Sequence, residues 1–227
     1  MPTISFASSK GGAGKSTSAV LLAAELAVRG TTVTLLDADP NQPVSRWGRK
    51  PGRPEGLRVV SDVTEESLIE AVEKAARETA FVIVDLEGTA SLLVAQAMSR
   101  SELVVIPCKG SVLDATEAVK AIKFIRRQER AYGRTIPFVL LFTQTNPAVR
   151  PRTLRALEGD MAGQGVPIFE TAIHERDAYR ALFAFGGTLY GLDPQLVHNL
   201  DAAIRNVRAF TAEVIAMLTP ATEAAVA

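Results

Sequence analysis

The sequence has little cysteine, no net charge and no long apolar run. Its 227 residues include one cysteine, Cys108, so no disulfide can form within the chain, and a lone thiol fits a reducing compartment. No apolar segment approaches the ~20 residues of a membrane-spanning helix, and the N-terminus lacks a charged segment followed by an apolar one. We therefore expect a soluble, cytoplasmic protein with no membrane partner.

Charge is balanced over the whole chain but not locally. The 25 basic and 25 acidic side chains cancel, so net charge does not decide for or against a nucleic-acid partner. Residues 120–155, however, contain nine basic residues and one acid, Glu129, which leaves +8. The basic residues are Lys120, Lys123, Arg126, Arg127, Arg130, Arg134, Arg150, Arg152 and Arg155. This stretch is either an ordinary solvated helix face or the footprint of a polyanion.

Short apolar runs rich in β-branched residues recur along the chain. They do not alternate with polar residues, which is typical of strands covered on both faces of a parallel sheet. The predicted strands are residues 4–8, 32–37, 81–85, 102–108 and 137–143. With 47% hydrophobic residues, the chain can bury a full core.

Helical patterns separate these runs. Apolar residues recur at helical spacing in residues 18–30, 65–78 and 112–132. Strand and helix in repeated order predict an α/β fold, doubly wound, with a mostly parallel sheet flanked by helices. We expect one domain over residues 1–218, a frayed tail at 219–227, and a long irregular loop at 46–56.

The segment SSKGGAGKST, residues 8–17, follows the first predicted strand and opens the first predicted helix. That context favours a phosphate-binding loop, because glycines let backbone N–H groups converge on phosphate oxygens at a helix N-terminus. Lys15 would reach the β- and γ-phosphates, Ser16 would ligate Mg²⁺, and Thr17 would bond a phosphate oxygen. The usual pattern has glycine where this chain has Ser9, and a second lysine, Lys10, follows that departure.

The KGGxGK[ST] form resembles the loop of the deviant Walker A ATPases, the ParA/MinD family of P-loop NTPases. Residues 35–42 (LLDADPNQ) resemble the family's second motif, and residues 81–88 (FVIVDLEG) its Walker B strand and switch region. Residues 106–118 (IPCKGSVLDATEA) resemble the next strand and helix start. Together these motifs cover about half of the chain, and the loop is the most specific of them.

The resemblance implies an enzyme that hydrolyses ATP with Mg²⁺, at a slow basal rate. Lys10 would be the signature lysine, which reaches across an ATP-dependent homodimer to the partner's phosphates as an arginine finger does. A solvated charge is the plainer alternative for a loop lysine. The nucleotide-binding residues implied for the loop are Lys10, Gly11, Gly12, Ala13, Gly14, Lys15, Ser16 and Thr17.

Three aspartates at predicted strand ends are candidates for the chemistry. Asp39 would orient or deprotonate the attacking water, while Asp37 and Asp85 would support Mg²⁺ through its waters. Asp37 and Asp39 could instead only cap the following turn. Asp85 ends an apolar strand, where a charge needs a partner. Glu87 competes with Asp39, but we favour Asp39 because Glu87 is not adjacent to Asp85.

The segment after the strand at 137–143 is the candidate adenine pocket. Gln144, Thr145 and Asn146 follow that strand, and Gln144 and Thr145 are the residues we expect to contact the nucleotide. All three are equally good turn formers, so a plain turn is the alternative interpretation.

Three functions fit the resemblance. The first is a ParA-like ATPase of plasmid or chromosome partition, which binds nucleoid DNA without sequence specificity and is released by a centromere-binding ParB-like partner. The second is a ParA-like ATPase of conjugative or T-DNA transfer that works with a transfer-apparatus protein, because residues 38–47 and 174–181 are similar to those of the small ATPase of T-DNA processing. The third, a MinD-like membrane-surface ATPase, needs a terminal basic amphipathic helix, yet no basic residue follows Arg208.

Overall fold

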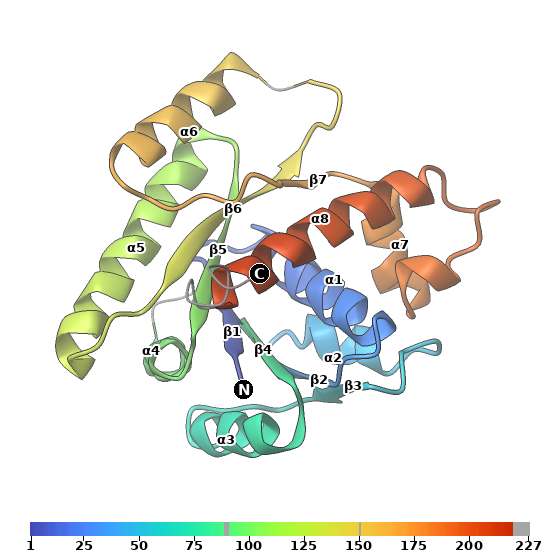
Figure 1. Cartoon of the computed structure of the whole chain (residues 1–227), viewed down its shortest axis with the longest axis horizontal. Helices are drawn as coiled ribbons and strands as arrows, with labels where there is room; N and C mark the ends of the chain where they lie inside the picture. The colour runs from blue at the N-terminus through green and yellow to red at the C-terminus, as the bar shows by residue number, and fades with distance from the viewer. Residues whose placement is uncertain (89–90, 150, 220–227) are drawn as a thin grey trace, which may run out of the picture.

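A seven-stranded, all-parallel sheet lies at the centre of the computed structural model, which describes residues 1–88, 91–149 and 151–219. The strand order is β3-β2-β4-β1-β5-β6-β7, so β1 is central and the topology is doubly wound (Figure 1). The strands are β1 (Thr3–Phe6), β2 (Val33–Ala38), β3 (Leu57–Val60), β4 (Phe81–Leu86), β5 (Leu103–Lys109), β6 (Phe138–Thr145) and β7 (Ile173–His174).

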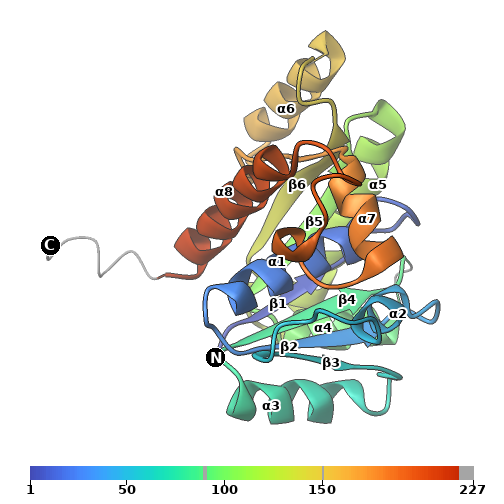
Figure 2. The same ribbon diagram turned by 90° about the vertical axis from the view of Figure 1, so that its right-hand side faces the viewer.

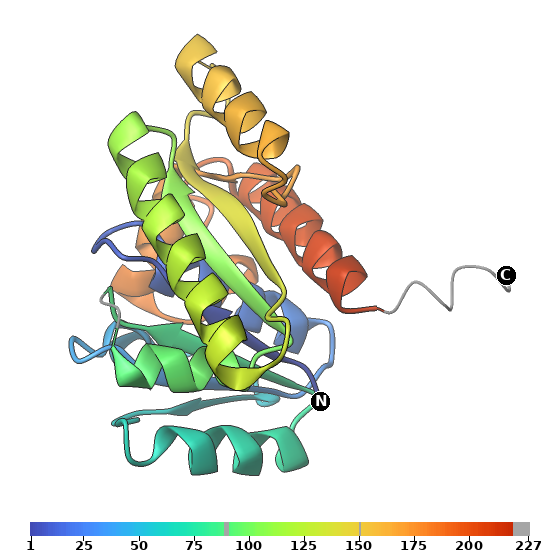
Figure 3. The same cartoon turned by 90° about the vertical axis from the view of Figure 1, so that its left-hand side faces the viewer.

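Helices cover both faces of the sheet, as Figures 2 and 3 show from opposite sides. One layer consists of α1 (Lys15–Val28), α2 (Pro43–Gly48), α7 (Asp177–Phe185) and α8 (Leu200–Leu218), with the short 3-10 helix η1 (Leu189–Gly191). The other consists of α3 (Leu68–Glu78), α4 (Leu92–Ser99), α5 (Val112–Tyr132) and α6 (Arg152–Gly163).

The two layers explain why the strands are apolar throughout. Successive side chains of a strand point to opposite faces, so Leu35 packs in the core beneath α1 and Leu36 in the core beneath α3. Ile83 and Val84 on β4 divide in the same way. Both faces are buried, and the α/β fold with a parallel sheet is confirmed.

All five predicted strands are present, with ends that differ by at most two residues from the prediction. Two edge strands, β3 and β7, were not predicted, because they contain only four and two residues and show no clear apolar run. The three predicted helices correspond to α1, α3 and α5.

The prediction of an irregular loop over residues 46–56 is wrong at its beginning. Residues 46–48 form the last turn of α2, which starts with Pro43 at a helix N-terminus where a missing N–H costs nothing. Trp47 is 1% exposed, and its indole N–H donates to the carbonyl of Gly187 at 3.2 Å. A buried indole with its donor satisfied fixes this segment against the chain leading out of α7.

The C-terminal helix α8 packs on α1 and ends at Leu218. Of the tail predicted at 219–227, residues 220–227 lie outside the described residues. Among the residues that the structure does describe, no helix is long and apolar enough to cross a membrane.

Candidate nucleotide site

The glycine-rich loop lies at the carboxyl end of β1, in the middle of the sheet, and leads directly into α1. Gly14 precedes the first helical residue with φ +91°, and a Cβ there would lie 3.3 Å from Thr143 of β6. The hydroxyl of Thr143 donates to the carbonyl of Ala13 at 2.7 Å. Strand β6 therefore supports the loop from below, and the turn requires glycine at position 14.

Lys15 opens α1 and is only 6% exposed. Its Nζ donates to the carbonyl of Lys10 at 3.4 Å, a long hydrogen bond. Burial lowers the pKa of the Lys15 ammonium. Three nearby carboxylates act against this shift: Asp85 most strongly, then Asp39 and Glu87. A buried cation at the N-terminus of a helix is placed to bind an anion.

Lys10 lies at the other end of the loop and is nearly half exposed. Its Nζ forms an ion pair with Oδ1 of Asp114 in the first turn of α5, at 2.8 Å. This contact raises the pKa of Lys10. Burial alone would raise the pKa of Asp114, but the hydrogen bonds from Lys10 and Ser111 outweigh it and lower that pKa. Ser9, where the usual loop has glycine, donates to Glu117 at 2.8 Å, so two successive loop residues are bound to α5.

Asp85 is the penultimate residue of β4, beside β1, and is fully buried. Neither of its carboxylate oxygens has a hydrogen-bond partner among the described residues. Burial raises the pKa of Asp85 to about 7, although the nearby Ser16 hydroxyl and the Lys15 charge oppose this rise. An unpartnered buried carboxylate beside Ser16 is the kind of group that the waters of a bound Mg²⁺ satisfy.

Asp37 lies opposite Asp85 on the adjacent strand β2. Its Oδ2 accepts the backbone N–H of Ser45 in the first turn of α2 at 2.6 Å, so Asp37 caps that helix. Burial raises its pKa, and the Ser45 contact opposes this change. Asp39 accepts the backbone N–H of Asn41 at 2.8 Å and stabilises a turn. Both aspartates thus make the capping contacts that the plainer interpretation predicts. These contacts hold both side chains beside the glycine loop.

A hollow of about 460 Å³ lies between the glycine loop and the ends of β2 and β4. Asp39 and Glu87 both line it, together with Lys15 and the loop glycines. The two candidate carboxylates therefore face the same space, and their position alone does not separate their roles.

A second hollow, of about 340 Å³, adjoins the first along Gly14, Thr17 and Gln144. Gln144 has φ +54°, and its side-chain amide donates to the carbonyl of Gly12 at 2.9 Å. Thr145 lines neither hollow, since its hydroxyl is hydrogen-bonded to Nδ1 of His174 at 2.8 Å.

Sequence reasoning missed the far wall of this second hollow. The wall comes from β7 and α7 and includes His174, Glu175, Arg176 and Tyr179. These residues fall within residues 174–181, the segment singled out only for its likeness to the T-DNA ATPase. Asn146 instead accepts the backbone N–H of Ala148 at 2.8 Å, as a turn former does.

The basic stretch at 120–155 divides between several places. Five of its cations lie on α5 and two on α6. They are Lys120, Lys123, Arg126, Arg127 and Arg130 on α5, and Arg152 and Arg155 on α6. Arg134 is used internally, because it donates to the carbonyl of Ser101 at 2.6 Å. Arg150 lies outside the described residues.

In the part of the chain that the structure describes, no three His, Cys, Asp or Glu side chains gather as a metal-binding cluster. Mg²⁺ in phosphate sites is held by one or two protein oxygens, phosphates and water, so the pair of Ser16 and Asp85 fits that ion. The chain has the features of the ParA/MinD class of P-loop ATPases. These are a doubly wound parallel sheet, a glycine loop before α1, a buried Lys15 and a second loop lysine, Lys10.

Comparison with known proteins identifies the family more narrowly. The model of the VirC1 protein family matches residues 1–218, and the chain belongs to this family. It is 42% identical to the protein ParA of Rhizobium radiobacter over 97% of this chain and 99% of that protein. It is 33% identical to the protein virC1 of Rhizobium rhizogenes over 80% of each chain.

A solved structure shares the fold at much lower identity. McdA of Cyanothece, in a complex with ATP, superposes with a TM-score of 0.75 at 14% identity, over 95% of this chain and 96% of that chain.

Proposed function

We propose that this protein is an ATPase that closes into a homodimer on binding ATP, binds DNA without sequence specificity, and serves plasmid or chromosome partition through partner-stimulated hydrolysis. The observation that carries the proposal is the pair of lysines in one loop. Lys15 is buried and lines the hollow of about 460 Å³, which we call the phosphate hollow, whereas Lys10 is nearly half exposed and paired with Asp114 of α5.

The phosphates bind where the loop leads into α1. Most of residues 11–17 line the hollow at the start of α1, so their backbone N–H groups are available to phosphate oxygens, and Lys15 supplies the positive charge for the β- and γ-phosphates. The base and ribose occupy the adjoining hollow between Gln144 and the wall formed by β7 and α7. The two hollows meet at Thr17, which contacts a phosphate between them.

The Ser16 hydroxyl would hold Mg²⁺, which when bound would neutralise charge on the phosphate oxygens. Asp85 and Asp37, which lie side by side on adjacent strands, would accept hydrogen bonds from its waters. These contacts would satisfy the unpartnered oxygens of Asp85.

Asp39 orients the attacking water from the wall of the phosphate hollow. Glu87 lines the same hollow and is the alternative group for this role. Lys10 must leave Asp114 to reach the phosphates of a second subunit, so the monomer lacks that cation at its own site and turns over slowly.

Gel filtration with ADP, with ATP and with a slowly hydrolysed ATP analogue tests the proposal. We expect a monomer with ADP and a dimer with ATP or the analogue. One elution volume in all three conditions would contradict ATP-dependent dimerisation, and an absence of hydrolysis in the dimer would contradict the ATPase.

DNA binding rests on the cations of α5, which carry most of the basic excess and are exposed. We propose that these cations contact DNA phosphates and place the protein on the nucleoid, in the cytoplasm. Each neutralised phosphate adds about −0.9 to the slope of log K against log[salt], so reversing Arg126, Arg127 and Arg130 together should remove up to about 2.7 from that slope. An unchanged slope would place the DNA face elsewhere, with Arg176, Arg180, Arg205 and Arg208 next to be tested.

Partition is the first candidate because the similarity to a protein named ParA covers nearly the full length of both chains. DNA transfer is the second candidate, favoured by the match to the VirC1 family over residues 1–218. A centromere-binding ParB-like partner belongs to the first function and a transfer-apparatus protein to the second. Adding each purified candidate encoded near this gene to the ATPase assay distinguishes them, because only the cognate partner should stimulate turnover.

A further inference from the structure

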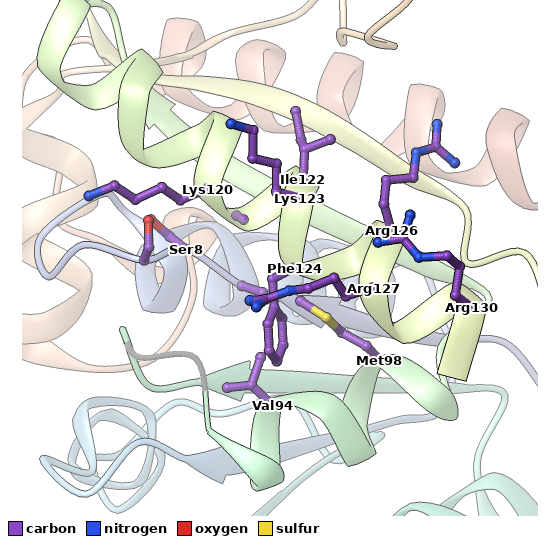
Figure 4. Close-up of a pocket in the computed structure, with 13 residues that line it drawn as sticks. Ser8, Val94, Met98, Lys120, Ile122, Lys123, Phe124, Arg126, Arg127 and Arg130 are labelled. Carbon is purple, nitrogen blue, oxygen red and sulfur yellow. The ribbon is translucent and has the colours of Figure 1, made fainter. Parts of the chain in front are cut away.

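A hollow of about 670 Å³ lies between α4 and α5, outside the nucleotide site (Figure 4). We call it the α4/α5 groove. Its floor is apolar and includes Val94 and Met98 from α4 and Phe124 from α5. In Figure 4 the ring of Phe124 points from α5 toward Val94, and the Arg127 side chain passes over it. The guanidinium of Arg127 lies 5.5 Å from the centroid of that ring.

Cations surround this floor. Five of the lining residues are basic and none is acidic. The basic residues are Lys120, Lys123, Arg126, Arg127 and Arg130. Two of these cations pair with acids outside the groove, Lys120 with Glu117 and Arg126 with Glu129. The groove therefore presents an apolar base within a positively charged rim.

DNA accounts for the rim but not for the floor. Phosphate contacts need cations and donors on the surface, whereas a recessed floor of valine, methionine and phenylalanine side chains gains nothing from a phosphate. A flat bilayer surface cannot enter a recess between two helices. Apolar side chains that project from a protein segment can enter such a recess, as when a groove binds an amphipathic helix.

A second copy of this chain offers no such segment in its described part. Its acidic helix is α3, with Glu70, Glu73 and Glu78, but the apolar side of α3 is already buried in the core. Leu68 and Val72 on that side are 0% and 3% exposed. The described part of the chain therefore favours an occupant from another protein.

We propose that the α4/α5 groove binds an acidic amphipathic helix of a partner protein, with its apolar side chains on the half-buried Phe124 and its carboxylates on the basic rim. Val94 and Met98, which are 4% and 1% exposed, support Phe124 from α4. Opposite charges select and orient this partner, and the buried apolar contacts supply most of its affinity.

The test uses a synthetic helical peptide of about 18 residues, roughly 27 Å long, with Leu and Phe on one side and Glu on the other. Fluorescence anisotropy should show binding to the wild-type chain, without nucleotide. A scrambled peptide of the same composition and a version with Lys in place of Glu should not bind. Failure of the first peptide to bind, or equal binding of all three, would overturn the proposal.

Two variants separate the peptide from DNA. Phe124→Ser removes a partly buried floor residue and should weaken the peptide at least about tenfold while leaving DNA binding unchanged. Arg127→Glu should weaken both ligands. Leu196→Ser, at an exposed site away from the groove, is the matched control and should change neither. Circular dichroism on each variant confirms folding.

Other occupants would give different results. Equal loss of DNA and peptide binding in Phe124→Ser would mean that the groove is part of a general polyanion surface. Binding of the wild type, but not of Phe124→Ser, to vesicles containing anionic lipid would indicate a membrane surface. A change of oligomeric state confined to Phe124→Ser would indicate a second copy. Each of these outcomes would overturn the proposal.

Discussion

Lys10 and Lys15 stand at the two ends of one glycine loop, but the protein surrounds them differently. Lys15 is 6% exposed, and burial lowers its pKa. Lys10 is nearly half exposed, and its ion pair with Asp114 raises its pKa. One cation is buried beside the hollow at the glycine loop, while the other is paired with a carboxylate near the surface of its own chain.

The difference indicates two kinds of task. Burial disfavours the charged form of Lys15, and a bound phosphate would favour it, so we propose that this lysine serves the nucleotide of its own subunit. The Lys10 end of the pair with Asp114 is nearly half exposed, so solvent and salt weaken the pair, although the Asp114 side chain is only 9% exposed. When Lys10 leaves, Asp114 keeps its hydrogen bond from the Ser111 hydroxyl, so Lys10 can act elsewhere, as the proposed dimer requires.

The largest expected effect comes from removing the movable cation. Lys10→Ala should keep ADP binding but lose ATP-dependent dimerisation, and with the dimer it should lose an acceleration of hydrolysis of about 10³- to 10⁵-fold, as loss of an arginine finger does. Isothermal titration with ADP and gel filtration with ATP measure the two parts. Lys74→Ala, on the exposed side of α3, is the control. A Lys10 variant that loses ADP affinity as Lys15→Ala does would contradict its separate role.

The carboxylates near Lys15 give the next effect. Asp39→Ala should lower single-turnover hydrolysis by about 10²- to 10⁴-fold while the variant still dimerises in ATP, because phosphate and Mg²⁺ contacts are kept. Glu87→Ala should retain most activity. The reverse pattern would assign the water to Glu87, and an Asp39 variant that does not dimerise would leave only its role in the turn at Asn41.

Removing the buried cation should act on binding rather than on assembly. Lys15→Ala should weaken ADP and ATP by roughly 10- to 150-fold each, the range expected for loss of charged hydrogen bonds. Titration calorimetry with both nucleotides measures this loss. If ATP affinity fell while ADP affinity stayed the same, Lys15 would contact only the γ-phosphate.

Most of the phosphate site could be predicted because it is encoded locally. The loop at 8–17 and the aspartates at the ends of two strands are each read within a few residues, and the parallel sheet brings their ends together. The contact between Lys10 and Asp114 could not be predicted in this way. It joins residues more than a hundred positions apart, and its existence depends on the packing of α5 beside the loop.

The second hollow, beside Gln144, and the α4/α5 groove could not be predicted from the sequence for the same reason. His174 and Tyr179 meet Gln144 only through β7, a strand of two residues without a periodic signal. Phe124 has the spacing of an ordinary core residue of α5, and the sequence gives no sign that α4 leaves it partly uncovered. Local sequence patterns predict helices and strands, whereas a hollow depends on how closely neighbouring helices and strands pack.

The smallest expected effect tests the hold on Lys10 itself. Asp114→Asn keeps the size of the side chain and its contact with Ser111 but removes the charge that retains Lys10. If that ion pair restrains the lysine in the monomer, the variant should dimerise in ATP about two- to fivefold more tightly, in keeping with the modest strength of exposed pairs. Sedimentation equilibrium with the slowly hydrolysed analogue measures the change, and salt should reduce the difference from wild type. Glu73→Gln, which breaks a half-exposed pair with Arg100 away from the glycine loop, is the matched control. Weaker dimerisation of Asp114→Asn would instead mean that Asp114 stabilises the dimer.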